Sequence, residues 1–288
     1  MKRMLLLFAA VLLVVGATMA QSKDNQSDVT ISDGSDDNEV IVKQTLYGNE
    51  LNTSEVSIND NSDDNDVTIE QEGEDLTSYV DIDDNSSNNE VNVDQDDEEQ
   101  TSEVSIVVNS DHNEVNVNQD DEGQESFVGI GYGSDYNDVD VDQDGKDNES
   151  YIGIGFSSDY NDVMVDQEGD DQGSYVEIAF GSSNNDVDVD QDGDDNISFV
   201  IIADDSDGNS VEVDQDGRDL LSGVGIADDS NGNDVEVGQD GRNHESYVEI
   251  YNDSSDTDVM VDQYGNYSTS DVEVSYGSDG NYIDVNQK

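Results

Sequence analysis

The feature that most constrains this fold is a glutamine that recurs every 24 residues along most of the chain. The row begins with Gln44 and Gln71, and its spacing is constant from Gln71 onward. Its later members are Gln95, Gln119, Gln143, Gln167, Gln191, Gln215, Gln239, Gln263 and Gln287. A fixed period of this length is typical of stacked structural repeats, in which each repeat contacts only its neighbours.

Each repeat contains two short segments in which apolar and polar residues alternate. In the copy that begins at Asn137, these segments are residues 137–143 and 150–154, and Gly145 lies between them. Such alternation predicts two half-buried β-strands joined by a turn that carries the glycine. The valines and the glutamine then face one way and the aspartates the other. An asparagine precedes the valines at the same spacing, as in the central copies at Asn137, Asn161 and Asn185.

These strands predict an all-β fold, a β-solenoid of about eleven stacked strand-turn-strand coils. Neither strand can bury its apolar face alone, but two opposed faces in stacked coils make a thin continuous core. Stacking at ~4.8 Å places each glutamine directly over the next, so the buried amides can hydrogen-bond along the axis as a ladder. We expect the asparagine row to do the same. The coils together predict one rod, roughly 50 Å long.

Composition alone would suggest disorder, because 74 Asp and Glu residues stand against 8 Lys and Arg residues and the formal net charge is -66. The strict period argues against disorder, since a disordered acidic tail has no reason to keep Val and Gln in register. The same charge disfavours nucleic acid as a partner, because phosphate contacts require Lys and Arg. Nothing in the sequence indicates catalysis. We expect His112 and His244 to be isolated on turns and to face solvent.

Residues 1–20 predict a secretory signal peptide, in which Lys2 and Arg3 precede an apolar run that ends in small residues. Residues 21–288 then form the mature repeat domain. No later stretch approaches the ~20 apolar residues that a membrane-spanning helix needs, so we expect an exported protein without membrane insertion. The chain contains no Cys, and disulfides therefore contribute nothing to its stability.

The repeat resembles that of a known family. Written as N-x-V-x-V-x-Q-x-G-x-x-N-x-S-x-V-x-I, it is similar to the curlin repeat of curli fibre subunits, S-x5-Q-x-G-x-x-N-x-A-x3-Q, over almost the whole mature chain. It departs where Asn137, Ser150 and Ile154, with their equivalents, stand for the Ser, Ala and second Gln of the family.

The resemblance implies a secreted functional-amyloid fibre subunit of the extracellular biofilm matrix, with a part in surface adhesion and aggregation. It implies an outer-membrane secretion channel and a nucleator subunit as partners. It leaves open whether this chain is the bulk subunit or the nucleator.

The acidic face of the first strand raises the question of a metal site. Asp140, Asp142 and Asp144, followed by Gly145, satisfy the opening of a calcium loop, but its twelfth position holds Tyr151 where a bidentate Glu is needed. We therefore expect no complete loop and no resident cofactor. The alternatives are weak Ca²⁺ binding between stacked carboxylates at these residues, or a solvated surface suited to high salt. Stacking like charges ~4.8 Å apart should also raise carboxylate pKa values.

The outer face of the second strand is different, because aromatic residues occupy one equivalent position in four consecutive repeats. They are Phe127, Tyr151, Tyr175 and Phe199, next to small residues such as Gly129 and Gly153. The rings are expected to form an exposed ladder. Two interpretations remain open: the rings simply stack along the rod as cross-coil pairs, or they form an interface for lateral fibre bundling or surface adhesion.

Two function classes follow. The leading one is a structural subunit whose end coils pair with those of the next molecule, and a final strand from Tyr282 to Gln287, with only Lys288 beyond, favours it. The alternative is a monomeric secreted acidic calcium-binding β-roll or adhesin, although the glycine-rich nonapeptide pattern of β-rolls is absent. A β-roll should need Ca²⁺ to fold, whereas a curlin-like chain should need no stoichiometric metal.

Overall fold

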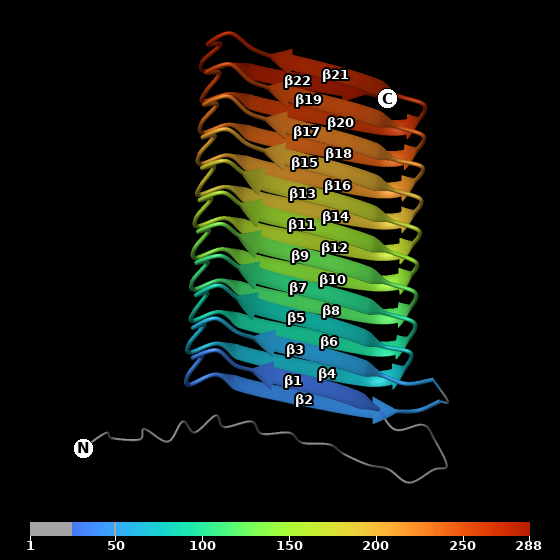
Figure 1. Cartoon of the computed structure of the whole chain (residues 1–288). Helices are drawn as coiled ribbons and strands as arrows, with labels where there is room; N and C mark the ends of the chain where they lie inside the picture. Colours follow the sequence, from blue (N-terminus) through green and yellow to red (C-terminus); the bar gives the residue numbers. More distant parts are fainter. Residues whose placement is uncertain (1–24, 49) are drawn as a thin grey trace, which may run out of the picture.

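The chain forms a rod of stacked β-coils (Figure 1). A computed structural model describes residues 25–48 and 50–288, and within them every regular element is a strand. The signal peptide expected at residues 1–20 lies outside the described residues. Each coil contributes one strand to each of two sheets, and both sheets are 11-stranded. The predicted all-β solenoid of about eleven coils is therefore confirmed.

The two sheets separate the strands by parity. The odd-numbered sheet contains, in order, β1 (Gln26–Ile31), β3 (Thr53–Ile58), β5 (Thr77–Asp83), β7 (Thr101–Val107), β9 (Glu125–Gly131), β11 (Glu149–Gly155), β13 (Gly173–Ala179), β15 (Ile197–Ile202), β17 (Leu221–Ile226), β19 (Glu245–Ile250) and β21 (Thr269–Val274). The even-numbered sheet contains β2 (Glu39–Leu46), β4 (Asp66–Glu74), β6 (Glu90–Glu98), β8 (Glu114–Glu122), β10 (Asp138–Lys146), β12 (Asp162–Asp170), β14 (Asp186–Asp194), β16 (Ser210–Arg218), β18 (Asp234–Arg242), β20 (Asp258–Asn266) and β22 (Tyr282–Gln287).

All neighbouring strands within a sheet are parallel and in register. Val141 of β10 lies opposite Val165 of β12, and Gln143 opposite Gln167. The same pairing holds in the first coil, where Gln44 lies opposite Gln71 although the step is 27 residues. The segment after β2 absorbs the extra length, so the register is kept.

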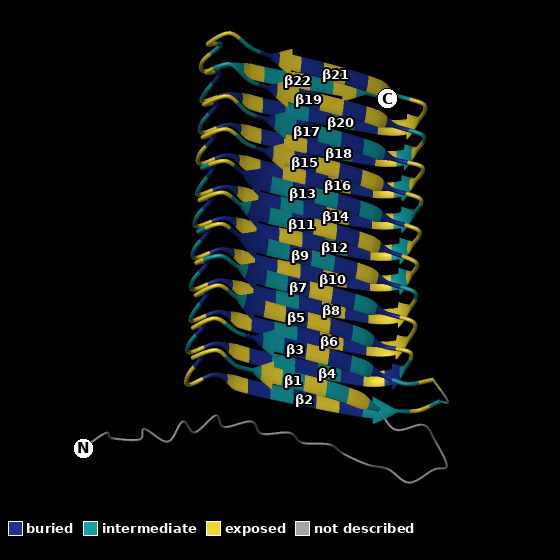
Figure 2. Cartoon of the chain, viewed as in Figure 1, coloured by how far each residue is buried: buried dark blue, intermediate teal, exposed yellow. Residues whose placement is uncertain are grey.

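The core is a narrow double row of aliphatic side chains between the two sheets. Val139 and Val141 of β10 face Ile152 and Ile154 of β11, and none of the four is more than 2% exposed. Because successive strand residues point to opposite faces, buried and exposed positions alternate along each strand. Figure 2 shows the buried positions as bands that run the length of the rod.

The predicted position of the turn glycine is wrong. Gly145 lies within β10, and the chain turns only after Lys146, at Asp147, whose φ is 54°. Glycine suits position 145 in β10, because φ is 114° and a Cβ in this conformation would lie 2.0 Å from the carbonyl oxygen of Gly169. In two coils Asp97 and Asp121 stand there with φ of 84° and 79°.

Candidate interaction surfaces

The inward glutamines form a continuous ladder of side-chain hydrogen bonds. Gln143 Nε2 donates to Gln167 Oε1 at 2.8 Å and also to the backbone oxygen of Glu125 at 3.3 Å. Along the row from Gln44 to Gln287, the amide-to-amide distances are 2.8 to 2.9 Å. A buried amide left unpaired would cost free energy, and the ladder removes that cost in each coil.

The inward asparagines form a second ladder that runs in the opposite direction. Asn137 Nδ2 donates to Oδ1 of Asn113 in the preceding coil at 3.0 Å, whereas each glutamine donates to the following coil. Asn161 and Asn185 continue the row at 2.9 and 3.1 Å. The backbone N–H of Asn137 donates to the same Asn113 oxygen at 2.9 Å. The asparagines therefore hold both side chain and backbone where the chain enters the even-numbered strands.

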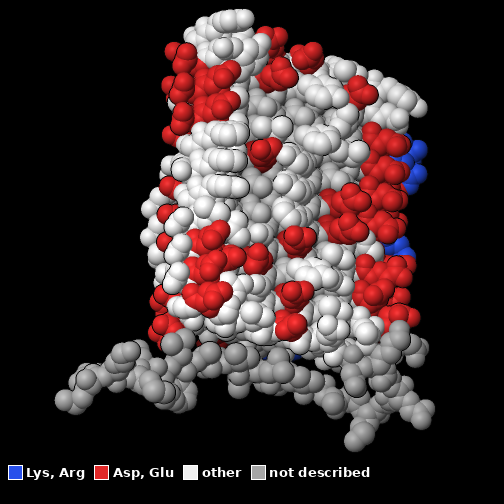
Figure 3. Space-filling model, viewed as in Figure 1, with Lys and Arg blue, Asp and Glu red and all other residues white. Residues whose placement is uncertain are grey.

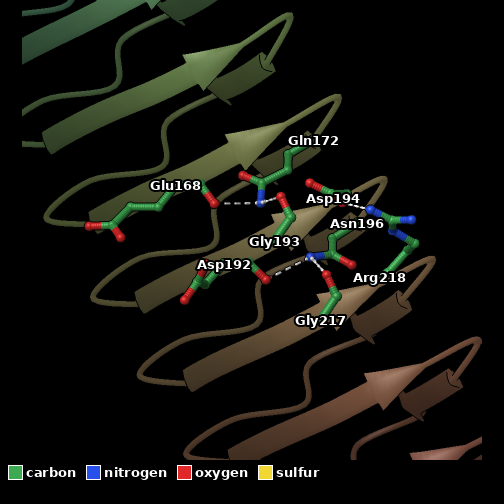
Figure 4. A network of polar contacts seen from close by, with 8 residues as sticks. All are labelled: Glu168, Gln172, Asp192, Gly193, Asp194, Asn196, Gly217 and Arg218. Atoms are coloured by element: carbon green, nitrogen blue, oxygen red, sulfur yellow. Dashed lines mark hydrogen bonds and ion pairs between the residues drawn. The ribbon is translucent and has the colours of Figure 1, made fainter.

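A third row of buried side chains lies at the turns between the even-numbered strands and the next odd-numbered ones, and it is polar except at Leu76 and Leu220 (Figure 4). Gln172 Nε2 donates to the backbone oxygens of Glu168 at 3.0 Å and Gly193 at 3.1 Å. Asn196 makes the equivalent contacts one coil further on, with Asp192 and Gly217. Each side chain thus ties its own turn to that of the next coil.

His244 belongs to this third row, and the expectation that it faces solvent is wrong. Its side chain is fully buried, and its Nδ1 accepts a hydrogen bond from the backbone N–H of Ser268 at 3.1 Å. Nε2 then carries the proton and lies 3.2 Å from the backbone oxygen of Asp240. The imidazole replaces a turn amide. The sequence contained a signal for this role, because His244 follows Asn196 and Leu220 at intervals of 24 residues and therefore occupies the same position of the repeat.

The inward serines of the odd-numbered strands are the main exception to this satisfaction of polar groups, beside single amide oxygens such as Oε1 of Gln100 and Gln172. The hydroxyl of Ser150 is buried and has no hydrogen-bond partner, and ten equivalent serines share this state. They are Ser27, Ser54, Ser78, Ser102, Ser126, Ser174, Ser198, Ser222, Ser246 and Ser270. This is the position at which the related repeat has Ala, so the fold has room for a small side chain and offers the hydroxyl nothing.

The outer face of the even-numbered sheet carries the rows of carboxylates expected from the sequence. The pKa of Asp138 is raised to about 6, first by burial and then by the carboxylates of Asp140, Glu114 and Asp162. The pKa of Asp166 is likewise raised to about 6, first by burial and then by Asp142 and other neighbouring carboxylates. Like-charge stacking was the expected cause of such shifts, but partial burial of the row contributes more.

Asp140, Asp142 and Asp144 all point outward from β10, two residues apart along one strand. Weak Ca²⁺ binding at these residues stays a prediction. In the part of the chain that the structure describes, carboxylates converge in two other places, with ligand atoms within 4.8 Å of one another. These triplets are Asp60, Asp83 and Asp84, and Asp97, Asp120 and Asp121.

The aromatic residues on the odd-numbered sheet stack as a ladder. Phe127 and Tyr151 have ring centroids 4.9 Å apart and an interplanar angle of 8°, and Tyr151 and Tyr175 are also 4.9 Å apart. Phe199 departs from the row, since its ring is tilted by 44° against Tyr175 at 6.3 Å. The stacking interpretation thus describes three rings well. Lateral bundling or adhesion through them stays a prediction.

Sequence reasoning missed two further aromatic ladders at the turns that follow the odd-numbered strands. Tyr132, Phe156 and Phe180 stack at 4.8 Å with angles of 3° and 12°. In the other ladder Tyr136 stacks on Tyr160 at 4.9 Å. The sequence carried their signal, because each row has the 24-residue spacing of the glutamines.

His112 extends the ladder of Tyr136 and Tyr160. Its ring lies 4.6 Å from that of Tyr136, at an interplanar angle of 17°. The side chain is exposed, as expected, but it is not isolated.

Both ends of the described rod have open sheet edges. Within residues 25–48 and 50–288, β1 and β2 each have a neighbouring strand on one side only, and so do β21 and β22. The inward residues of β1 and β22, which are Val29, Ile31, Ile283 and Val285, pack against the core but are only partly buried. Such edges carry unpaired backbone groups, which can pair with another chain.

Comparison with known proteins agrees with this geometry. No curated protein matches the chain. Nor do the described residues contain a helix that is long and apolar enough to cross a bilayer. Residues 135–169 match the model of the curlin associated repeat, a stretch that contains β10, β11 and most of β12. The other coils repeat the register of this segment, so the rod is built throughout from coils similar to the one that matches the curlin associated repeat.

Proposed function

We propose that this protein is a secreted structural subunit of a curli-like functional amyloid fibre in the extracellular biofilm matrix, where it serves surface adhesion and aggregation. The curlin repeat and the solenoid fold suggest a structural rather than an enzymatic protein. The observation that carries the proposal is the match between the two open ends of the rod. A secretion channel and a nucleator are partners that the family suggests.

The inward rows continue when one rod is placed on the next, head to tail, at the spacing used inside the rod. With β22 followed by β2 of the next molecule, Val285 lies over Val42 and Gln287 over Gln44. The valine core and the glutamine ladder then pass from molecule to molecule. Such a head-to-tail contact does not close, so it generates a filament.

The outer rows of the even-numbered sheet favour the same contact, because no acidic residues oppose one another across it. In the odd-numbered sheet there is one such pair, since Asp271 would lie over Asp28. Asp284 would lie over Ile41, and Asn286 over Lys43. Lys43 already forms an ion pair with Glu70 inside its own rod.

Some steps inside the rod are less favourable in charge. Between β14 and β16, Asp188 lies opposite Glu212 and Asp190 opposite Asp214. In an exposed sheet, like charges directly opposite each other are destabilising. In the even-numbered sheet, the proposed junction therefore has less repulsion than this step, which the folded chain already tolerates.

A charge placed at the junction tests the proposal. Ile41→Asp would set an aspartate against Asp284 of the next molecule, whereas the control Thr68→Asp adds the same charge to the same row one coil inside. We expect the wild type and Thr68→Asp to form fibres with a meridional reflection near ~4.8 Å, and Ile41→Asp to show a lag several times longer by sedimentation. A wild type that stays monomeric, or equal lags for both variants, would contradict the proposal.

The calcium-dependent β-roll is the alternative, and the two carboxylate triplets are the observation that favours it. The two functions differ in the effect of a chelator. For the fibre subunit, circular dichroism of the chain in EDTA should keep its β-signal, and for the β-roll the signal should be lost.

A further inference from the structure

A trough runs along the outer face of the odd-numbered sheet, parallel to the rod. Its floor is formed by outward glycines, among them Gly129 and Gly153, and its volume is about 250 Å³. Its walls are the aromatic ladder of Phe127 and Tyr151 on one side, and the ladder that contains Phe156 on the other. The trough is hollow because side chains are missing from its floor.

The same row shows what fills this position elsewhere. The outward place of Gly129 and Gly153 is taken by Glu177 and Ile201 in the two coils that follow. The backbone accepts a side chain there, since a Cβ on Gly153 would meet only the ring of Tyr151 at an ordinary 3.4 Å. Neither glycine has a positive φ. The strand conformation therefore does not require these glycines, but the hollow does.

The walls are ridges of regular height and period. Rings stack at 4.8 to 4.9 Å in both ladders, which leaves their edges exposed. Tyr151 is 41% and Phe156 49% exposed. Each aromatic ladder thus forms a ridge that runs beside the trough on the same face of the rod.

Charge is scarce on this face, in a chain whose formal net charge is -66. Figure 3 shows a broad face on which the acidic residues are densest along the borders and isolated between them. Glu177 limits the trough at its C-terminal end, and its carboxylate is engaged by the hydroxyl of Tyr175 at 2.6 Å. Two rods with this negative charge repel one another over most of their surface. The repulsion is weakest at this face, so two rods can approach each other there.

We propose that the trough binds the exposed ring edges of an aromatic ladder from a second copy of this chain, so that fibres associate in lateral pairs. Rows that repeat at the coil spacing stay in register only with a partner of the same period, and a second solenoid has that period. A two-fold axis parallel to the rod places the ridge of each copy in the trough of the other. The contact is isologous, with two ridges and two troughs.

The size of the contact predicts that single rods do not pair. A contact that spans five strand residues and four coils has an area of about 300 Å² on each partner. Stable protein interfaces bury about 800 Å² on each side. In a fibre the same patch recurs in each subunit, and the contacts add by multivalency. The inference therefore rests on the proposed fibre and describes how fibres bundle.

The test uses one substitution at two places in the same row. Gly153→Glu puts a carboxylate into the trough, next to Glu177, and Gly225→Glu puts one outside it, next to Glu249. Each variant thus gains one like-charged neighbour, and only the first obstructs the ridge. A third variant, Gly153→Ile, fills the trough without charge, using the residue that Ile201 places in this row.

Negative-stain electron microscopy of the full chain measures the fraction of fibre length found in lateral pairs. We expect pairs for the wild type and Gly225→Glu, and at least a fivefold loss for Gly153→Glu and Gly153→Ile. Pairing of both Gly153 variants at the wild-type level, or unpaired wild-type fibres, would overturn the inference and leave the fibre proposal intact. An absence of fibres in the wild type would overturn both.

Discussion

At the scale of single residues, the molecule separates two kinds of buried serine. Ser134 Oγ donates to the backbone oxygen of Gly131 at 2.9 Å and accepts from the N–H of Ser158 at 3.1 Å. Ser150 Oγ has no partner. Both side chains are buried, so they differ in hydrogen bonding and hardly in burial. A buried hydroxyl without a partner costs free energy, and a paired one contributes.

Alanine substitutions should therefore have opposite effects at these two positions. Ser134→Ala should lower the free energy of unfolding by about 1 to 2 kcal/mol, because it leaves the N–H of Ser158 unpaired. Ser150→Ala should leave it unchanged or raise it by up to about 1 kcal/mol. Guanidinium unfolding followed by circular dichroism measures both. A loss of stability in Ser150→Ala as large as that in Ser134→Ala would show that the Ser150 hydroxyl is bonded.

The sequence predicted the inward and outward assignment of strand residues, because alternation with period two and the 24-residue repeat reinforce each other. It did not predict that His244 is buried. A histidine in an acidic, polar turn has no local signal of burial, and its role follows only from the column it shares with Asn196. The turn glycine was misplaced by two residues, since strand ends depend on hydrogen bonds to neighbouring coils that periodicity does not contain.

At the scale of strands, the acidic rows set how stability depends on pH. The pKa of Asp138 and of Asp166 is about 6 in the folded chain, against an ordinary 3.8. The folded state therefore holds protons that the unfolded chain releases. Below about 3.8 both states are protonated and there is no penalty, and stability is lost as pH rises from there to about 6. Acid should thus favour the stack.

The prediction is that the free energy of unfolding falls between pH 3.8 and about 6, and that Asp138→Asn with Asp166→Asn flattens this fall. The control Asp171→Asn removes a charge from an exposed turn residue with φ of 58°, a conformation that Asn tolerates. Denaturant titrations at several pH values measure the slope. A slope that is unchanged in the double variant would mean that these two carboxylates do not carry the effect.

At the scale of the whole molecule, each coil is stabilised by its neighbours, and the end coils lack one. The aliphatic core, the glutamine ladder and the asparagine ladder all run along the rod axis, so no interaction inside the rod specifies where it should stop. A solenoid that remains monomeric normally has shielded edges. The described rod has open edges with matching rows at both ends.

The resemblance to curlin repeats predicted the fold well and the surfaces less well. Inward residues are fixed by stacking and recur in every coil, so a repeat pattern describes them. Outward residues vary from coil to coil. The trough between Phe127 and Phe156 arises from glycines in two neighbouring coils, and such a local feature is visible only once the rows have been aligned in space.

Cysteine cross-linking across the proposed junction tests the central claim most directly. The chain has no Cys, and Ile41 and Asp284 lie in the first and last coils, roughly 50 Å apart in one rod. In the head-to-tail stack they lie one strand spacing apart, within the range of a disulfide. Oxidised fibres of the Ile41→Cys, Asp284→Cys double variant should give a ladder of covalent multimers on a non-reducing gel, and either single variant should give monomer. Monomer from the double variant, or dimers from a single one, would contradict the account.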